Sequence, residues 1–184
     1  MSETIVEYDP HWPAQFEREA ERLRTTFGSR ALRIERIDHI GSTAVVGLAA
    51  KPIIDIQVVL PDRASIDTCW ELLAATDYTI ARIPIEYLHK PVTWPHSHHV
   101  HLRTLGSDDE QRFRLFRDWL RSHAADRAAY AQLKRALAQH ADLTNPQDRV
   151  RYSEAKTQFV REIERRAGLR TGASVACSQE DGSP

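Results

Sequence analysis

The sequence predicts an α+β fold, in which helices pack on a small mixed sheet and a helical C-terminal part closes a cleft. Strand-like segments gather before about residue 106, and helical periodicity dominates residues 107–168. No repeated strand–helix–strand unit appears along the chain. We expect a single domain over residues 1–170 and a disordered tail over 171–184, which lacks apolar periodicity.

The first predicted helix begins near Pro13 and ends at Gly28. Its apolar residues recur at spacings of three and four, which places them on one face: Phe16, Ala20, Leu23 and Phe27. The clearest strand is IIDIQVVL, residues 53–60, whose side chains alternate between two faces. A second helix carries Ile66, Trp70 and Leu73, and further strands are expected at 33–40, 78–83, 85–92 and 98–105.

Three helices are predicted after Gly106. They cover 108–123, 126–140 and a final segment that runs from the cap Asn145-Pro146 toward Gly168. The four tryptophans are expected in the core rather than at a ligand: Trp12, Trp70, Trp94 and Trp119.

Composition narrows the classes of function. Of 184 residues, 41% are hydrophobic and 28% are charged, and the formal net charge of -1 gives no support for bulk capture of nucleic acid or anionic membrane. Two cysteines exclude a disulfide scaffold and a Cys-rich zinc module. No apolar run resembles a secretory signal or a membrane span, so we expect a cytoplasmic protein.

A turn after the strand 33–40 is the first candidate site. Gly41, Ser42 and Thr43 would expose backbone N–H groups suited to a phosphate. Thirteen residues after Ser42, Asp55 interrupts a strand of Ile and Val and could hold a divalent cation beside that phosphate, with Lys51 adding positive charge. The alternative is an ordinary turn followed by an edge or capping aspartate, but the combination favours function because a buried carboxylate is costly unless it is paired or metal-bound.

Histidines form the second candidate site. The predicted strand HHVHLRTL, residues 98–105, places His99, His101 and Arg103 on one face. An alternating His pair can bind a transition metal, for which Asp55 or His39 would be the third ligand. The same imidazoles could instead donate hydrogen bonds to phosphate, or simply form a solvated polar face.

Two tyrosine–lysine pairs lie at positions i and i+4 of the C-terminal helices. Tyr130 pairs with Lys134, and Tyr152 pairs with Lys156. Each pair can stack a base and bind a phosphate. Alternatively, each tyrosine packs between helices while the lysine extends outward.

Several separated motifs resemble the GrpB family. They include VEYDPHWPAQF, HIGSTAVVGLAAKPIIDI, the HVH strand, FRDWLRSH, AYAQLK and YSEAKTQFV, and the resemblance covers roughly residues 4–168. It implies a fold of the nucleotidyltransferase superfamily related to polymerase beta. That superfamily pattern continues from Gly-Ser to two carboxylates on one strand and a third on a neighbouring strand.

Two departures from this pattern affect the implied site. Gln57 stands at the second carboxylate position, and the third carboxylate has no clear counterpart, with Glu86 as the substitute. The resemblance implies catalytic roles for Asp55, Gln57 and His101, with Mg²⁺ held by Asp55. The implied substrate- and phosphate-binding residues are His39, Gly41, Ser42, Thr43, Lys51, His99, Arg103, Tyr130, Lys134, Tyr152 and Lys156.

Three functions therefore stay open, and the sequence leaves undecided whether the chain is an enzyme. The first is Mg²⁺-dependent transfer of a nucleotidyl group from a nucleoside triphosphate to a small acceptor. The second is a degenerate protein that binds a nucleotide or phosphorylated metabolite without turnover, for which Gln57 is the main argument. The third is a metal-dependent hydrolase that uses the histidines.

Overall fold

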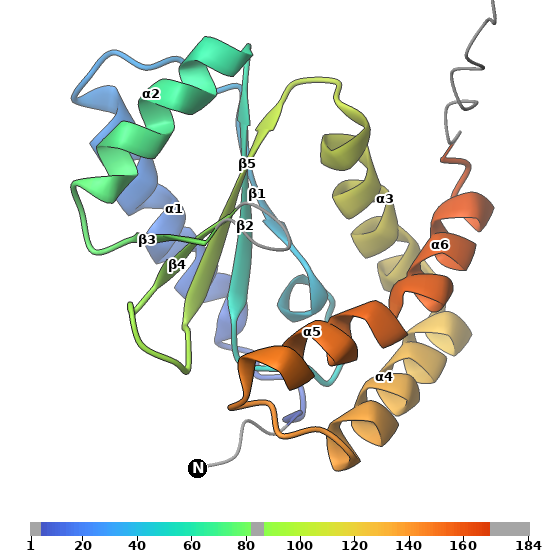
Figure 1. Cartoon of the computed structure of the whole chain (residues 1–184). Helices are drawn as coiled ribbons and strands as arrows, with labels where there is room; N and C mark the ends of the chain where they lie inside the picture. The colour runs from blue at the N-terminus through green and yellow to red at the C-terminus, as the bar shows by residue number, and fades with distance from the viewer. Residues whose placement is uncertain (1–4, 82–86, 170–184) are drawn as a thin grey trace, which may run out of the picture.

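A computed structural model describes residues 5–81 and 87–169, and these residues form a five-stranded mixed sheet with helices on both faces (Figure 1). The strand order is β1-β2-β5-β4-β3; β5 runs parallel to β2, and the other neighbours are antiparallel. The strands are β1 (Arg36–Ile40), β2 (Ile54–Leu60), β3 (Thr79–Ala81), β4 (Tyr87–Lys90) and β5 (His98–Thr104). The predicted α+β class is confirmed.

One face of the sheet carries the main apolar core. Helices α1 (Trp12–Gly28) and α2 (Arg63–Ala74) cover it (Figure 1). The apolar face predicted for α1 is buried there, together with alternate residues of β2: Ile54, Ile56, Val58 and Leu60. Burying each such side chain contributes about 1.5–3 kcal/mol. This packing fixes the orientation of β2, so Asp55 and Gln57 face the opposite side.

The opposite side of the sheet carries the C-terminal helices (Figure 1). They are α3 (Asp108–Ser122), α4 (Ala124–Gln139), α5 (Pro146–Ala155) and α6 (Thr157–Arg166). A second apolar cluster joins them to the loop after the short 3₁₀ helix η1 (Ser42–Ala44), through Val45, Leu48, Leu120, Tyr130 and Ala131. This cluster brings the C-terminal helices against the segment that follows Gly41.

The single helix predicted from Pro146 toward Gly168 is wrong: the segment forms α5 and α6, which meet at Lys156. There the Lys156 N–H donates to the Ser153 carbonyl at 3.3 Å, and Figure 1 shows the axis changing direction. The two halves pack on different partners. Lys51 lies over the Tyr152 ring at 4.8 Å, whereas Phe159 stacks on Tyr130 with ring centroids 5.1 Å apart.

Four sequence-based expectations concern residues outside the described ranges. The end of the strand 78–83, the start of the strand 85–92 and Glu86 fall in 82–86, and the whole predicted tail, 171–184, falls in 170–184. Within the described ranges, no helix combines the length and apolar character needed to cross a membrane.

Candidate functional site

Asp55, His99 and His101 meet on the face of β2 and β5 that lies opposite α1 and α2, on the side of the C-terminal helices. β2 and β5 pair in parallel, with Asp55 opposite His99 and Gln57 opposite His101. Because alternate residues of a strand share a face, the register that buries Ile54 and Ile56 in the core places these polar side chains together on the other side.

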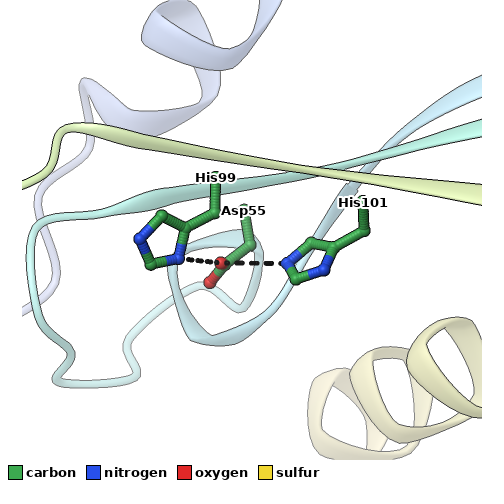
Figure 2. A group of neighbouring side chains, drawn as sticks. All are labelled: Asp55, His99 and His101. Atoms are coloured by element: carbon green, nitrogen blue, oxygen red, sulfur yellow. Dashed lines mark ion pairs between the residues drawn. The ribbon is translucent and has the colours of Figure 1, made fainter. Parts of the chain in front are cut away.

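The three side chains converge on one point. His99 Nδ1 lies 3.3 Å and His101 Nε2 lies 3.7 Å from the same oxygen, Asp55 Oδ1 (Figure 2). One ligand atom from each residue lies within 4.8 Å of the others. His99 also contacts His96 through its second ring nitrogen, with Nε2 3.0 Å from His96 Nδ1. The group forms a compact donor set of one carboxylate and two imidazoles.

Gly41 brings the turn after β1 against the carboxylate. Its φ is +70°, a conformation that L side chains rarely adopt. A Cβ atom at this position would lie 2.4 Å from Asp55 Oδ2, so only glycine permits this close approach. The next residues, Ser42 and Thr43, start η1, and the Thr43 hydroxyl donates to the Ile53 carbonyl just before β2. The turn is thereby fixed to the strand that carries Asp55.

A cavity of about 400 Å³ opens beside the three residues. Cationic side chains from three segments line it: Lys51 precedes β2, Lys134 comes from α4, and Arg149 and Lys156 come from α5 and its C-cap. Lys134 is 2% exposed and donates to the Ser42 hydroxyl at 2.9 Å. Helices that follow the sheet in sequence thus supply most of the positive charge around Asp55.

The pKa shifts favour an ionised Asp55 beside a neutral His101. Burial opposes ionisation of Asp55, but contacts with His101 and His99 outweigh it and hold the pKa of the carboxyl well below its usual range. Burial lowers the pKa of His101, and the neighbouring Asp55 only partly offsets that effect. An ionised carboxylate and a neutral imidazole are the forms that bind metal ions.

Burial also lowers the pKa of two lysines, so less of each is protonated near neutral pH. It lowers the pKa of Lys134 to about 7, with Lys156 and Arg135 adding repulsion. It lowers the pKa of Lys156 to about 8, with repulsion from Lys51. Neither ammonium forms an ion pair with a carboxylate in the part of the chain that the structure describes; each lies over a tyrosine ring instead. A bound anion would restore the ordinary charge of both groups.

The structure places the sequence-predicted residues in two groups. The following residues line the cavity: Ser42, Thr43, Lys51, Asp55, His99, His101, Lys134, Tyr152 and Lys156. Gly41 is not among the lining residues, but it packs directly against the Asp55 side chain. Four others do not line it, namely His39, Gln57, Arg103 and Tyr130.

Each of these four residues packs against or hydrogen-bonds to other parts of the protein instead. His39 stacks on Phe16 and its Nε2 lies 3.0 Å from the Thr43 hydroxyl. Gln57 is fully buried and donates to the Glu110 carbonyl of α3 at 3.3 Å. Tyr130 is buried beside Phe116 and Phe159, although the Lys134 ammonium lies over its ring. Arg103 lies over the Phe113 ring and 3.8 Å from Asp109 of α3.

Sequence reasoning missed three aromatic or cationic residues that line the cavity, namely Tyr87, Trp94 and Arg149. Tyr87 lies 4.6 Å from the His99 ring, and Arg149 lies 4.0 Å above the Trp94 ring. The core role expected for Trp94 is therefore wrong. No local pattern distinguishes Tyr87 or Arg149. Trp94, however, lies between Pro91 and Pro95, and two prolines so close together indicate a turn rather than a regular core element.

Comparison with known proteins places this geometry in one family. The family model described as GrpB protein matches residues 3–166. A UPF0157 protein of Halalkalibacterium halodurans is 42% identical over 166 residues, a match that covers 89% of this chain and 82% of that protein. The crystal structure of conserved protein GrpB from Enterococcus faecalis has a TM-score of 0.72 at 33% identity and covers 88% of this chain and 95% of its own.

Another group of relatives carries a different name. A protein of Mycolicibacterium paratuberculosis named dephospho-CoA kinase is 37% identical over 166 residues. The match covers 75% of this chain but 40% of that protein. More than half of the kinase-named protein therefore has no counterpart in the match.

Proposed function

The chain belongs to the GrpB family, and we propose that its cavity binds a nucleotide or a chemically similar phosphorylated metabolite. The observation that carries the proposal is the charge of the cavity lining. Lys51, Lys134, Arg149 and Lys156 surround a space in which Asp55 is the one acidic side chain among the described lining residues. Cationic groups around a concave site favour a ligand with several negative charges.

The burial of the lysines supports a ligand that brings charge with it. Lys134 is almost inaccessible and Lys156 lies against Tyr152, so keeping both ammonium groups charged costs free energy in the empty cavity. Phosphate oxygens would accept hydrogen bonds from both ammonium groups and offset that cost. Lys134 already donates to Ser42, which directs its ammonium toward the turn after β1.

The aromatic residues fit the organic part of such a ligand. Tyr87, Trp94 and Tyr152 line the same cavity, whose volume of about 400 Å³ lies in the range of small-molecule sites. Aromatic side chains offer flat apolar faces on which a planar base can stack. A phosphorylated ligand with a ring system matches both parts of the lining.

Nucleotidyl transfer with Mg²⁺, the reaction implied by the superfamily resemblance, has weaker support from these side chains. Mg²⁺ prefers oxygen ligands, and two-metal phosphoryl chemistry needs several carboxylates. Among the described residues that line the cavity, Asp55 is the one carboxylate. Gln57 does not line the cavity; it lies beneath α3, where its side-chain amide donates a hydrogen bond to the Glu110 carbonyl. The described lining residues therefore do not fit a two-magnesium centre.

The relatives named dephospho-CoA kinase agree with a phosphorylated ligand of this class. Their name denotes phosphoryl transfer to dephospho-CoA, but this chain corresponds to about two-fifths of the protein from Mycolicibacterium paratuberculosis. We therefore extend to this chain the substrate class and not the kinase activity.

Titration with ATP and with inorganic pyrophosphate tests the proposal. Lys134→Gln and Lys156→Gln should each weaken ATP binding about 10-fold, because each removes one charged contact to phosphate. Isothermal titration calorimetry gives the Kd. Arg151→Gln is the matched control, since its exposed side chain pairs with Asp148 on α5 outside the cavity lining. Failure of the wild type to bind either probe, or equal binding by all variants, would overturn the proposal.

ATP affinity should also fall as pH rises from 7.5 to 9.5. The pKa values of Lys134 and Lys156, about 7 and about 8, mean that both ammonium groups lose protons in or below this window when the cavity is empty. ATP keeps its full charge in this window. Because the lysines must take up protons when ATP binds, binding becomes less favourable as pH rises, and we expect the affinity to fall about 10-fold or more.

The double variant Lys134→Arg, Lys156→Arg should flatten this dependence, because guanidinium groups stay charged throughout. The measurement is the Kd for ATP at four pH values at constant ionic strength. A wild-type affinity that is constant or rises with pH would contradict the assignment of phosphate binding to these two lysines.

A further inference from the structure

We infer that Asp55, His99 and His101 form a binding site for one divalent transition-metal ion such as Zn²⁺. The disagreement between these side chains and a magnesium centre leads to this inference. One carboxylate oxygen and two imidazole nitrogens are a donor set suited to zinc and related metals, whereas Mg²⁺ prefers oxygen ligands. The inference does not depend on the proposed nucleotide binding, because the metal can be titrated alone.

The spacing of the donor atoms fits a single ion. His99 Nδ1 and His101 Nε2 lie 3.3 and 3.7 Å from Asp55 Oδ1. Ligands bound to zinc at about 2.0–2.2 Å in tetrahedral geometry lie roughly 3.4 Å from one another. Figure 2 shows both rings directing a nitrogen edge at the carboxylate. An ion could therefore enter between the three side chains with small rotations.

Backbone placement holds the three ligands in position. Asp55 and His99 are direct register partners on the two central strands, and His101 follows on the same face. Gly41 closes the far side of the carboxylate, next to Oδ2, which leaves Oδ1 toward the imidazoles. Sites built on strands hold their ligands more accurately than sites built on loops.

His96 provides an outer partner for one ligand. His99 directs Nδ1 at Asp55 and holds its other nitrogen, Nε2, 3.0 Å from His96 Nδ1. A metal-bound histidine usually donates its second N–H to a neighbouring acceptor, which fixes the tautomer and the ring orientation. The His96 ring is itself held by stacking on His89, with centroids 3.8 Å apart.

The same site would keep coordination positions open toward the cavity. Asp55, His99 and His101 all line the cavity that Lys134 and Lys156 enter. Catalytic zinc sites have three protein ligands and one exchangeable position, whereas structural sites have four protein ligands. The geometry thus assigns the metal an exposed position, at which water or an anion can complete its coordination sphere.

Titration of the chelator-treated full chain with Co²⁺ and Zn²⁺, without nucleotide or phosphate, tests the inference. The wild type should bind about one equivalent of Co²⁺ with visible ligand-field absorption, and Zn²⁺ should displace it. His99→Gln, His101→Gln and Asp55→Asn should each weaken binding by more than about 100-fold, beyond the loss typical of outer-shell substitutions. Mg²⁺ in millimolar excess should not compete.

His98→Gln is the matched control, because His98 is the neighbour of His99 on β5 and is absent from both the donor group and the cavity lining. It should retain wild-type affinity, and thermal unfolding without metal should show that every variant is folded. The inference would be overturned by a folded wild type that binds no Co²⁺ or Zn²⁺. It would also be overturned if the variants of Asp55, His99 and His101 bound these ions as well as His98→Gln does. Either result would leave ATP binding by the lysines unaffected, so the two proposals fail separately.

Discussion

Gly41→Ala should lower the free energy of unfolding by about 2–6 kcal/mol and disturb the position of Asp55. Two costs add at this residue. The φ of +70° with a ψ of −168° lies in a region that is essentially restricted to glycine and costs an L residue about 1–3 kcal/mol. The new Cβ would also lie 2.4 Å from Asp55 Oδ2 and 3.0 Å from Asp55 Cβ, so the turn or the strand must shift at a further cost of about 1–3 kcal/mol. Urea denaturation monitored by circular dichroism measures the loss.

Gly47→Ala separates the two costs. Gly47 has a similar φ of +77°, but nothing lies within 4 Å of the Cβ that alanine would add. This variant should lose about 1–2 kcal/mol from backbone strain alone. It should also keep the Co²⁺ affinity of the wild type, whereas Gly41→Ala should weaken it. Equal losses of stability in both variants would show that the close approach of Gly41 to Asp55 carries no cost of its own.

The face on which the candidate site lies could be predicted from the sequence because strand periodicity is local. The alternation in IIDIQVVL separates Asp55 from the Ile and Val side chains that enter the core, and the same alternation places His99 and His101 together. Asp55 was accordingly one of two residues that the sequence suggested as a third ligand beside the histidines. The structure brings Asp55 to that position and leaves His39 stacked on Phe16.

The remaining parts of the site depend on tertiary contacts that periodicity does not encode. Arg149 lines the cavity from α5, a separate helix that ends at Ala155, whereas the cap and spacing suggested one continuous helix as far as Gly168. The sequence suggests a core position for Trp94, and only the tertiary contact with Arg149, which lies over its ring, shows otherwise. The contact of Gly41 with Asp55 joins the turn after β1 to β2, so the sequence shows a Gly-Ser turn but not the close approach that requires the glycine.

Gln57→Glu should destabilise the protein by about 3 kcal/mol at pH 8 and should not raise its affinity for Mg²⁺. If the site used two carboxylates on this strand, glutamate would restore the second. The structure instead buries Gln57 completely, with its amide donating to the Glu110 carbonyl. A carboxylate there loses that bond and gains a buried charge. Its register partner His101 has a pKa lowered by burial and so offers no ready positive charge.

The loss should depend on pH with a defined sign. Burial raises the pKa of the new carboxyl above its unfolded value of about 4.3. The folded state then binds more protons than the unfolded state, so the destabilisation is smallest below about pH 4.3 and grows as pH rises through the folded pKa. Gln57→Met, which retains the volume without an ionisable group, should cost less than about 1.5 kcal/mol at either pH. Urea denaturation at pH 5 and pH 8, with Mg²⁺ titration in the presence of ATP, measures both effects. A glutamate variant that is as stable as the wild type and binds Mg²⁺ more tightly would place residue 57 in the cavity and restore the two-carboxylate site that its burial argues against.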